Sequence, residues 1–391
     1  MKVLLLSLTV AAGAVGAPPT YTVEYIGPAM HVDGVNNAGV AIGWRMSDGV
    51  MRAWLGSPDR RMIDLPLPRG FVSSQAYDIN DAGVIVGAVD RDGAFDAASA
   101  VRWVPNRNGS YTVELLGMFD GYPESAATAI NESGDIVGYA TFTDVRDQHA
   151  VWFNSPRGVM DLADRGLDEI PVAINDKRHV LAGQGILDLD TMRLYTLPDP
   201  TSDMRPIPPT VETSDLNNFD DVVGRAGHEN RGYMNVCWTR EFGWEALLPF
   251  ETRFGSAYAI NDLGQVVMDD GVDSVYIWDR DNGAFDLTTR IPGDSNGWTF
   301  VPNFGNDIND AGQIAAIARN RFDRQAGAVL LTPVSDCAGD FNADGNRDIL
   351  DFVAFQNAFV AGSRNADCNG DRVLDVLDFV CFQRSFQAAC P

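Results

Sequence analysis

The sequence has little of what metal-centred or nucleophilic catalysis requires. Its 391 residues include four histidines and five cysteines, and neither set shows the spacing of a zinc site. It has no nucleophile elbow, no phosphate-binding loop and no H-E-x-x-H helix. A glycosidase would need two carboxylates at a fixed separation, and a chain with 54 acidic residues does not reveal such a pair. We therefore predict no particular catalytic residue.

Positive charge is also scarce. The 29 lysines and arginines leave a formal net charge of -25. Nucleic acid and anionic membrane surfaces would repel such a chain, so neither is expected as a partner. An acidic surface is compatible with binding of cations, and it also keeps a protein soluble.

Long apolar runs are missing as well. No segment has the run of about 18 apolar residues that a membrane-spanning helix needs. The N-terminus instead combines Lys2 with an apolar stretch from Val3 to Val15 and then small residues, which is the pattern of a secretory signal peptide. Cleavage after Ala14 fits the A-x-A pattern, and we assign residues 1–17 to the signal region. The mature protein is therefore predicted to be soluble and extracellular or attached to the cell surface, where disulfides can form.

What the sequence does contain is a repeat. Seven related strings, such as "DINDAGVIVG", "AINESGDIVG" and "DINDAGQIAA", recur at steps of 42 to 51 residues. Their first asparagines are Asn36, Asn80, Asn131, Asn175, Asn217, Asn261 and Asn309. Each string is followed by an aromatic strand such as "AVRWVP" and then by a strand that ends in Asp-Leu or similar, such as "GVMDLA". A unit of a few short strands cannot bury its own faces, so the units must pack against one another.

The last unit lacks its final strand, and the N-terminus carries a spare one. "YTVEYIG" at residues 21–27 nearly copies "YTVELLG" at residues 111–117, which ends the second unit. If the N-terminal strand completes the seventh unit, the array closes into a ring without open ends. We therefore predict an all-β repeat domain over residues 18–335, folded as a seven-bladed β-propeller. An open β-solenoid is the alternative, and the split seventh unit counts against it.

We interpret the Asn-Asp-x-Gly motif as a hairpin turn rather than as a catalytic site. Asparagine and glycine adopt positive φ at low cost, and Asn or Asp side chains bond to nearby backbone in turns. Arg178 and Asp220 replace the glycine in the fourth and fifth units, so these two turns are predicted to differ from the others. Tryptophans at strand centres, such as Trp103 and Trp152, are predicted to pack between blades rather than to form a sugar-binding platform.

These repeats resemble the HAF extracellular repeat family. The likeness extends over the seven units and rests on the core A-x-IN-x-x-G-x-V-V-G. The resemblance implies a secreted, propeller-like protein, and it implies no particular reaction.

The C-terminal region repeats a different pattern. "DFNADGNRDILD" at residues 340–351 and "DCNGDRVLDVLD" at residues 367–378 place side-chain oxygens at the same loop positions, 1, 3, 5, 9 and 12. Calcium takes six to eight oxygen ligands, and a twelve-residue loop supplies them, with the seventh residue using its backbone carbonyl. The predicted ligands of two calcium ions are Asp340, Asn342, Asp344, Asn346, Asp348 and Asp351 in the first loop, and Asp367, Asn369, Asp371, Val373, Asp375 and Asp378 in the second. Because these carboxylates repel one another without an ion, folding of the region is expected to depend on calcium.

A structural alternative explains part of each loop. Asp348 and Asp375 could be helix N-caps, with Asp351 and Asp378 as the first-turn acids of a capping box. This alternative does not explain the remaining acids or their return at the same offsets. Arg372 replaces the turn glycine at position 6 of the second loop, which makes that loop less typical.

Each loop leads into a helical pattern. The two segments share "LDFVxFQxxF", and the phenylalanines recur at helical spacing. They are Phe352, Phe355 and Phe359 in the first segment and Phe379, Phe382 and Phe386 in the second. We expect the two helices to bury these faces on each other.

The duplicated loop-helix region, residues 336–391, resembles a dockerin, the calcium-dependent anchoring module of secreted polysaccharide-degrading systems. The resemblance implies an attachment to a cohesin-like or other extracellular protein. In dockerins the residues at loop positions 10 and 11 help to contact that partner. The matching residues here are Ile349, Leu350, Val376 and Leu377. These apolar pairs serve either recognition or the start of the helix core, and both interpretations stay open at this point.

The cysteines suggest how this small domain is held. Cys337 and Cys390 flank it, and a disulfide between them would pin both ends. Cys368 with Cys381 is the second candidate pair. Cys237 would then be unpaired and buried in a blade.

Three functions are compatible with the sequence. The first is a secreted, non-catalytic binding or scaffold protein, whose propeller presents a binding face, for example to a polysaccharide, and whose C-terminal domain attaches it to a partner. The second is a polysaccharide-degrading enzyme, a glycoside hydrolase or lyase with its site in the propeller channel. The third is a purely structural surface protein. We favour the first.

Overall fold

The structure is a computed structural model. It describes residues 19–93, 98–117, 119, 121–142, 148–198, 210–228, 232–248, 255–280, 282–292, 297–334, 339, 341, 349–360, 366, 368 and 373–387. Contacts divide the chain into two compact units, a large one of Tyr21–Pro333 and a smaller one that includes Val334–Pro391. The predicted signal region lies outside the described residues. Among the described residues, no helix has the length and apolar character needed to cross a membrane.

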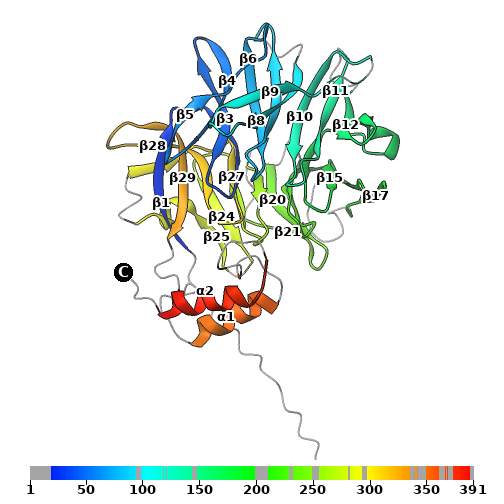
Figure 1. Cartoon of the computed structure of the whole chain (residues 1–391). Helices are drawn as coiled ribbons and strands as arrows, with labels where there is room; N and C mark the ends of the chain where they lie inside the picture. The colour runs from blue at the N-terminus through cyan, green and yellow to red at the C-terminus, as the bar shows by residue number, and fades with distance from the viewer. Residues whose placement is uncertain are drawn as a thin grey trace, which may run out of the picture. The chain divides into compact units, whose positions relative to one another are not determined.

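The large unit is a seven-bladed β-propeller, which confirms the prediction from the repeats (Figure 1). Blades 1 to 6 are four-stranded antiparallel sheets whose strands follow one another in chain order from the centre outward. Blade 1 has β2 (His31–Val35), β3 (Ala41–Ser47), β4 (Val50–Ser57) and β5 (Arg60–Asp64); blade 2 has β6 (Ser73–Ile79), β7 (Ile85–Asp90), β8 (Ser99–Pro105) and β9 (Tyr111–Leu115); blade 3 has β10 (Glu124–Ile130), β11 (Ile136–Thr141), β12 (Gln148–Ser155) and β13 (Gly158–Asp161).

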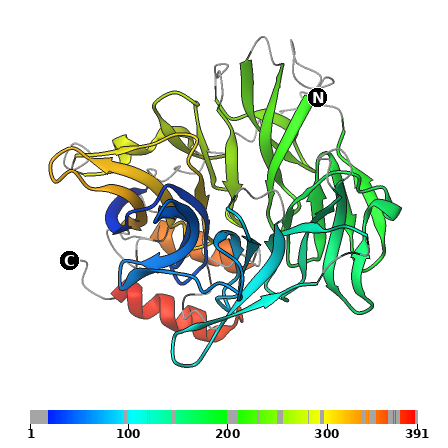
Figure 2. The same cartoon turned by 90° about the horizontal axis from the view of Figure 1, so that it is seen from above.

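Blades 4 to 6 repeat this order with shorter strands. Blade 4 has β14 (Pro171–Ile174), β15 (His179–Ala182), β16 (Gly185–Asp188) and β17 (Arg193–Thr196); blade 5 has β18 (Thr210–Leu216), β19 (Val222–His228), β20 (Gly232–Thr239) and β21 (Gly243–Ala246); blade 6 has β22 (Ala257–Ile260), β23 (Val266–Asp269), β24 (Val275–Asp279) and β25 (Gly283–Asp286). Two 3-10 helices, η1 (Ala163–Arg165) and η3 (Leu287–Arg290), follow blades 3 and 6. Seen from above, the blades surround a common centre (Figure 2).

Blade 7 is built from both ends of the large unit. Its sheet runs from β1 (Thr20–Gly27) through β29 (Ala326–Val334) and β28 (Ile314–Asn320) to an inner strand in two pieces, β26 (Trp298–Phe300) and β27 (Asn306–Ile308). The N-terminal strand is thus the outermost strand of the last blade, as the sequence predicts. Tyr21 on β1 is completely buried in the core that blades 6 and 7 share. Pairing of the two ends of the unit leaves no blade that has to be capped.

The repeated motif forms a hairpin turn between the first two strands of every blade. In all seven turns, the backbone N–H of the fourth motif residue donates to the carbonyl of the first asparagine. Five of these fourth residues are glycines with φ between 71° and 82°, a range that glycine adopts at little cost. The structural interpretation of the motif is therefore confirmed.

The first asparagine of the motif ties each blade to the next. Each of these buried asparagines donates from Nδ2 to the backbone carbonyl of its counterpart in the next blade, at 2.8–3.2 Å. Its Oδ1 accepts the backbone N–H of the residue four positions later in its own turn. Only an amide side chain of this length supplies both a donor and an acceptor here, because a carboxylate has no donor.

A second ring lies one residue further along the chain. Its members are Asn37, Asp81, Glu132, Asp176, Asn218, Asp262 and Asp310. The side-chain oxygen of each accepts the backbone N–H of its counterpart in the preceding blade, at 2.7–3.0 Å. Since this position needs an acceptor alone, Asn, Asp and Glu all serve, which explains why the motif varies here and not at its first asparagine.

The core lies between neighbouring blades. Trp103 and Trp152 are buried in it, which confirms that they pack rather than form an exposed platform. The indole N–H of Trp103 donates at 2.8 Å to the carbonyl of Pro66, in the segment that connects blade 1 to blade 2. Cys237 is a free, buried cysteine of blade 5, as predicted.

The smaller unit contains two helices, α1 (Ile349–Val360) and α2 (Val376–Gln387). The repeated phenylalanines pack together between them, as predicted. Phe355 and Phe382 occupy equivalent positions in the two repeats and stack on each other, with ring centroids 4.3 Å apart and planes 3° from parallel. A disulfide joins Cys368 to Cys381, which confirms the second candidate pair. The other pair, Cys337 with Cys390, lies outside the described residues.

Candidate functional site

The two turns that lack glycine keep the backbone of the other five. Arg178 and Asp220 have φ of 64° and 68°, and their N–H groups make the same turn hydrogen bond as the glycines. The prediction that these turns differ in conformation is therefore wrong for the backbone. A side chain at such φ costs on the order of 1–2 kcal/mol, and strained positions of this kind cluster at functional sites.

The side chain of Arg178 spans three neighbouring elements. Its guanidinium lies 3.1 Å from Asp135 of blade 3 and 3.2 Å from Asp190 in the turn between β16 and β17. It also lies over the ring of Trp152 at 5.2 Å from the ring centroid. Arg178 therefore connects blade 3 to blade 4 and positions the outer turn of blade 4.

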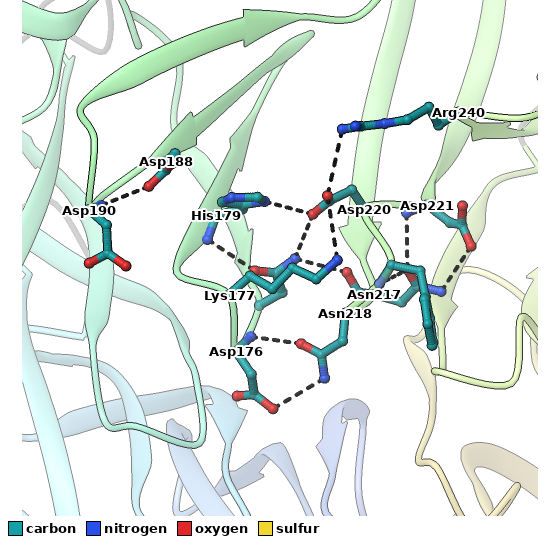
Figure 3. Close-up of polar contacts among 12 residues, drawn as sticks. Asp176, Lys177, His179, Asp188, Asp190, Asn217, Asn218, Asp220, Asp221 and Arg240 are labelled. Carbon is teal, nitrogen blue, oxygen red and sulfur yellow. Dashed lines mark hydrogen bonds and ion pairs between the residues drawn. The ribbon is translucent and has the colours of Figure 1, made fainter. Parts of the chain in front are cut away.

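The side chain of Asp220 points back from blade 5 toward blade 4 (Figure 3). Its Oδ1 accepts hydrogen bonds from Nδ2 of Asn175 at 3.0 Å and pairs with Nδ1 of His179 at 2.7 Å. Its Oδ2 lies 3.7 Å from Nζ of Lys177 and 3.9 Å from the guanidinium of Arg240. The carboxylate is buried and surrounded by donors, so its charge is compensated within the protein.

The contact between Asp220 and His179 fixes the orientation of the imidazole. His179 opens β15 directly after its turn, and its Nδ1 faces the carboxylate. A carboxylate on Nδ1 leaves Nε2 as the nitrogen for proton exchange or ligand contact. The substitution of glycine by Asp220 in one blade therefore orients a histidine of the blade before it.

These residues border a pocket between blades 4 and 5. The pocket has a volume of about 370 Å³. Its lining is His179, Ile186, Asp188, Thr191, Arg193, Leu194, Tyr195, Asp220, Trp238 and Arg240. The volume lies at the lower end of the range typical of small-molecule sites. The combination of apolar walls with a few charged groups is also typical of such sites.

The two acids of the pocket are occupied by the protein itself. Asp188 accepts the N–H groups of Asp190 and Thr191 on Oδ1 and the Thr191 hydroxyl on Oδ2. Burial acts to raise the pKa of Asp188, but these hydrogen bonds outweigh it and lower the pKa below its usual value. Asp188 therefore stays ionised and holds the turn between β16 and β17.

The two arginines of the pocket are held much less firmly. Arg193 makes no side-chain hydrogen bond or ion pair with any described residue, and Arg240 has the 3.9 Å contact with Asp220. The side chain of Arg240 is 78% exposed. Guanidinium donors thus remain available at the pocket although the chain as a whole is strongly acidic.

Tyrosine and tryptophan form one wall of the pocket. The rings of Tyr195 and Trp238 are 6.0 Å apart between centroids and tilted by 42°. Trp238 is buried, whereas Tyr195 is 47% exposed. The exposed ring of Tyr195 gives the pocket a surface on which a flat ligand could pack.

Three of the carboxylates on the inner strands, Asp78, Asp215 and Asp307, also have structural partners. Each accepts the N–H of the next residue in its own strand and a second N–H from the following blade, at 2.7–2.8 Å. Burial raises the pKa of Asp78 to about 7 and that of Asp215 to about 6, and it raises the pKa of Asp307 well above its usual value. These carboxylates tie adjacent blades together, so they do not form the free acid pair that a hydrolase site in the channel would need.

Most of the predicted calcium ligands lie outside the described residues. These are Asp340, Asn342, Asp344, Asn346, Asp348, Asp367, Asn369 and Asp371. Of the remaining four, Asp351 and Asp378 are completely buried in the first turns of α1 and α2, and Val373 has an exposed side chain. The described part of the chain contains no group of three or more His, Cys, Asp or Glu side chains arranged to hold a metal.

The second loop also shows the capping box that the structural alternative predicts. Oδ1 of Asp375 accepts the N–H of Leu377 at 2.7 Å, and Oδ2 of Asp378 accepts the N–H of Asp375 at 2.9 Å. The two interpretations agree on these residues, because a position-12 acid has a second oxygen. They differ on the acids that lie outside the described residues.

The predicted partner-binding residues are exposed. Ile349, Leu350, Val376 and Leu377 lie at the N-terminal ends of α1 and α2 with exposed side chains. They therefore do not start the helix core, which is made by the phenylalanines. The repeat places an equivalent apolar pair on each helix.

Sequence reasoning did not find the pocket. Its residues come from two blades and from strands β15, β16, β17 and β20, and no motif connects them. The one signal was the loss of glycine at Arg178 and Asp220 in neighbouring repeats. A non-glycine residue at a position that demands positive φ adds backbone strain. Such a residue therefore indicates that the contacts of its side chain compensate for that strain.

The comparisons with known proteins give distant structural similarities alone. No protein-family model matches the chain, and no curated protein sequence is similar to it. The HAF and dockerin resemblances therefore stay predictions. The chain is similar in structure to an oligogalacturonate lyase from Vibrio parahaemolyticus, with 7% identity, 80% of this chain and 91% of that chain covered, and a TM-score of 0.49. It is also similar to virginiamycin B lyase from Staphylococcus aureus, with 12% identity, 80% and 100% covered, and a TM-score of 0.46.

Proposed function

We propose that this protein is a secreted, non-catalytic binding protein. Its propeller binds a small polar ligand, free or as part of a polysaccharide, in the pocket between blades 4 and 5. Its C-terminal unit binds two calcium ions and attaches the protein to an extracellular partner. The observation that carries the proposal is the convergence of the side chain of Asp220, which replaces a turn glycine, with His179 and two arginines on one pocket.

The binding role is supported by the way the pocket is built. Its acids are occupied by internal hydrogen bonds, and its turns are stiffened by contacts to three blades. A site held in this way needs little rearrangement to bind a ligand, which favours affinity. Two donors and an aromatic face remain directed to a ligand.

A variant with a filled pocket tests the binding role. Leu194→Trp on β17 should block the pocket, and Leu115→Trp on β9, the corresponding outermost strand of blade 2, is the matched control because both leucines are exposed. The full chain and both variants are compared on a glycan array and in a thermal-shift screen of small polar molecules. A ligand of the wild type and of Leu115→Trp that Leu194→Trp no longer binds supports the proposal. Equal binding by all three chains, or no binding to the wild type, contradicts it.

Attachment through the C-terminal unit is supported by the exposure of its four apolar residues at loop positions 10 and 11. The test is retention of the full chain on the host's extracellular fraction in calcium and in chelator. The double variant Leu350→Asp with Leu377→Asp should abolish calcium-dependent retention. Retention that is the same with and without calcium contradicts the attachment role.

The pair of His179 and Asp220 favours one second function, an enzyme of polysaccharide breakdown. An imidazole held by a carboxylate on Nδ1 is the usual arrangement of a general base. The test is turnover of acidic and neutral polysaccharides by the full chain. Activity that His179→Gln loses while ligand binding persists would establish catalysis in place of simple binding.

A further inference from the structure

We infer that the ligand of the pocket between blades 4 and 5 is a small carboxylate with a ring that presents an apolar face. Arg193 and Arg240 would bind its carboxylate, and the ring of Tyr195 would pack on its face. The inference rests on the proposed binding function and narrows it to a ligand class. The shared chemistry has two sources, an acidic sugar such as a uronic acid and an aromatic acid.

The negative charge of the ligand is inferred from the charged groups of the pocket. Its two acids already have hydrogen-bond partners in the protein, whereas its two arginines have few or none in the described part of the chain. Asp188 is satisfied by its turn, and Asp220 is satisfied by Asn175 and His179. Arg193 has no side-chain partner among the described residues, and the closest carboxylate oxygen to Arg240 is 3.9 Å away. The groups left to meet a ligand are therefore guanidiniums, and guanidinium binds planar carboxylates in a paired geometry.

The rest of the chain makes this local charge informative. The protein has a formal net charge of -25, so an anion would be repelled from most of its surface. Other arginines of the propeller are held by acids, for example Arg225 by Glu212 and Arg280 by Glu245. Arg193, which has no side-chain partner among the described residues, and Arg240, whose contact with Asp220 is long at 3.9 Å, lie on one pocket, where an anion can bind.

The ring of the ligand is inferred from the apolar wall of the pocket. Tyr195 is 47% exposed, although its ring lies against the buried Trp238. Leu194 and Ile186 extend this apolar surface within the pocket. A bare inorganic anion would leave this wall wet, whereas a ligand with an apolar ring face would cover it.

Binding by the full chain is measured by calorimetry with galacturonate, benzoate, glucose and inorganic phosphate. The variants are Arg193→Gln, Arg240→Gln, Tyr195→Leu and Tyr195→Phe. The matched control is Arg107→Gln, which removes an exposed arginine from the turn between β8 and β9 of blade 2. We expect one or both carboxylates to bind, with affinity reduced about tenfold in each arginine variant and in Tyr195→Leu. Tyr195→Phe and Arg107→Gln should bind as the wild type does, and added salt should weaken binding.

The outcomes separate the ligand class from the binding function. Galacturonate without benzoate identifies an acidic sugar, and benzoate without galacturonate identifies an aromatic acid. If glucose binds as tightly as galacturonate and the arginine variants have no effect, the inference that the ligand carries a carboxylate is overturned, and the pocket remains a binding site. If inorganic phosphate binds as tightly as either carboxylate, the inference that the ligand has a ring is overturned. No binding of any of the four while Leu194→Trp still blocks another ligand overturns the inference and leaves the proposed function intact.

Discussion

Asn309 donates a hydrogen bond from Nδ2 to the backbone carbonyl of Asn36, 273 residues earlier in the chain, at 2.8 Å. It is the last of seven equivalent bonds, and it completes a ring through the centre of the propeller. In the same blade, β1 pairs with β29 and closes the outer edge of the propeller. The propeller is therefore closed twice, by side chains at the centre and by backbone at the rim.

Replacing an asparagine of this ring by aspartate should destabilise the propeller. Asn80→Asp removes the donor to the carbonyl of Asn131 and places a charge at a buried position. We expect the free energy of unfolding to fall by about 3 kcal/mol, measured by thermal and denaturant unfolding. Asn108→Asp is the control, since its side chain is exposed and only its oxygen is used, to accept from Ser110. Equal stability of the two variants would show that the ring contributes nothing.

Two substitutions of Tyr21 distinguish the contribution of packing from that of hydrogen bonding in β1, the strand that closes blade 7. The ring is completely buried, and its hydroxyl has no hydrogen-bond partner among the described residues. Tyr21→Ala should lower the free energy of unfolding by about 3–5 kcal/mol, because it leaves a cavity between blades 6 and 7. Tyr21→Phe should leave stability unchanged or raise it slightly, because no bond is lost. Strong destabilisation by Tyr21→Phe would reveal a partner for the hydroxyl.

The stability of the propeller should fall as the pH rises from about 4 through about 7. Asp78 and Asp215 have raised pKa values of about 7 and about 6, and that of Asp307 is raised as well. A carboxyl group with a raised pKa binds its proton more tightly in the folded state, so its contribution is largest below the unfolded pKa and is lost above the folded one. Unfolding temperatures at about pH 5 should exceed those at about pH 8.

A single substitution checks the source of this pH dependence. Asp78→Asn removes one titrating group and one acceptor of a backbone N–H. The variant should be less stable at every pH, with a smaller difference between acidic and neutral conditions. A difference as large as that of the wild type would assign the effect to other groups.

Calcium should determine the fold of the C-terminal unit and leave the propeller unaffected. Asp340→Ala combined with Asp367→Ala removes the first predicted ligand of each loop, and the helical circular dichroism signal of α1 and α2 should then be lost. Chelation of calcium should have the same effect on the wild type, while the β signal and the unfolding temperature of the propeller stay the same. Asp351→Asn with Asp378→Asn extends the test to the predicted ligand at position 12 of each loop, which the structure describes. Helices that persist in chelator would favour the capping interpretation.

Most of the fold could be predicted from the sequence repeat, for a physical reason. An asparagine that must both donate and accept cannot vary, so the seven ring positions stand out in the sequence. The copied strand at residues 21–27 likewise revealed which end completes blade 7. The two helices followed from the second, shorter repeat, whereas the disulfide between Cys368 and Cys381 was only the second of two candidate pairs. Local hydrogen bonding and burial repeat with the sequence, and therefore both could be read from it.

The sequence by itself determined a closed array of seven similar blades and a duplicated C-terminal unit, because each blade has the same internal bonding needs. Only the tertiary structure decided where the array departs from its own symmetry. Asp220 lies 41 residues from His179 in the chain, yet the turn of blade 5 brings its carboxylate within 2.7 Å of Nδ1 of His179 in blade 4. The side chains of the pocket meet because adjacent blades are rotated about a common centre, and no spacing along a linear sequence records that rotation.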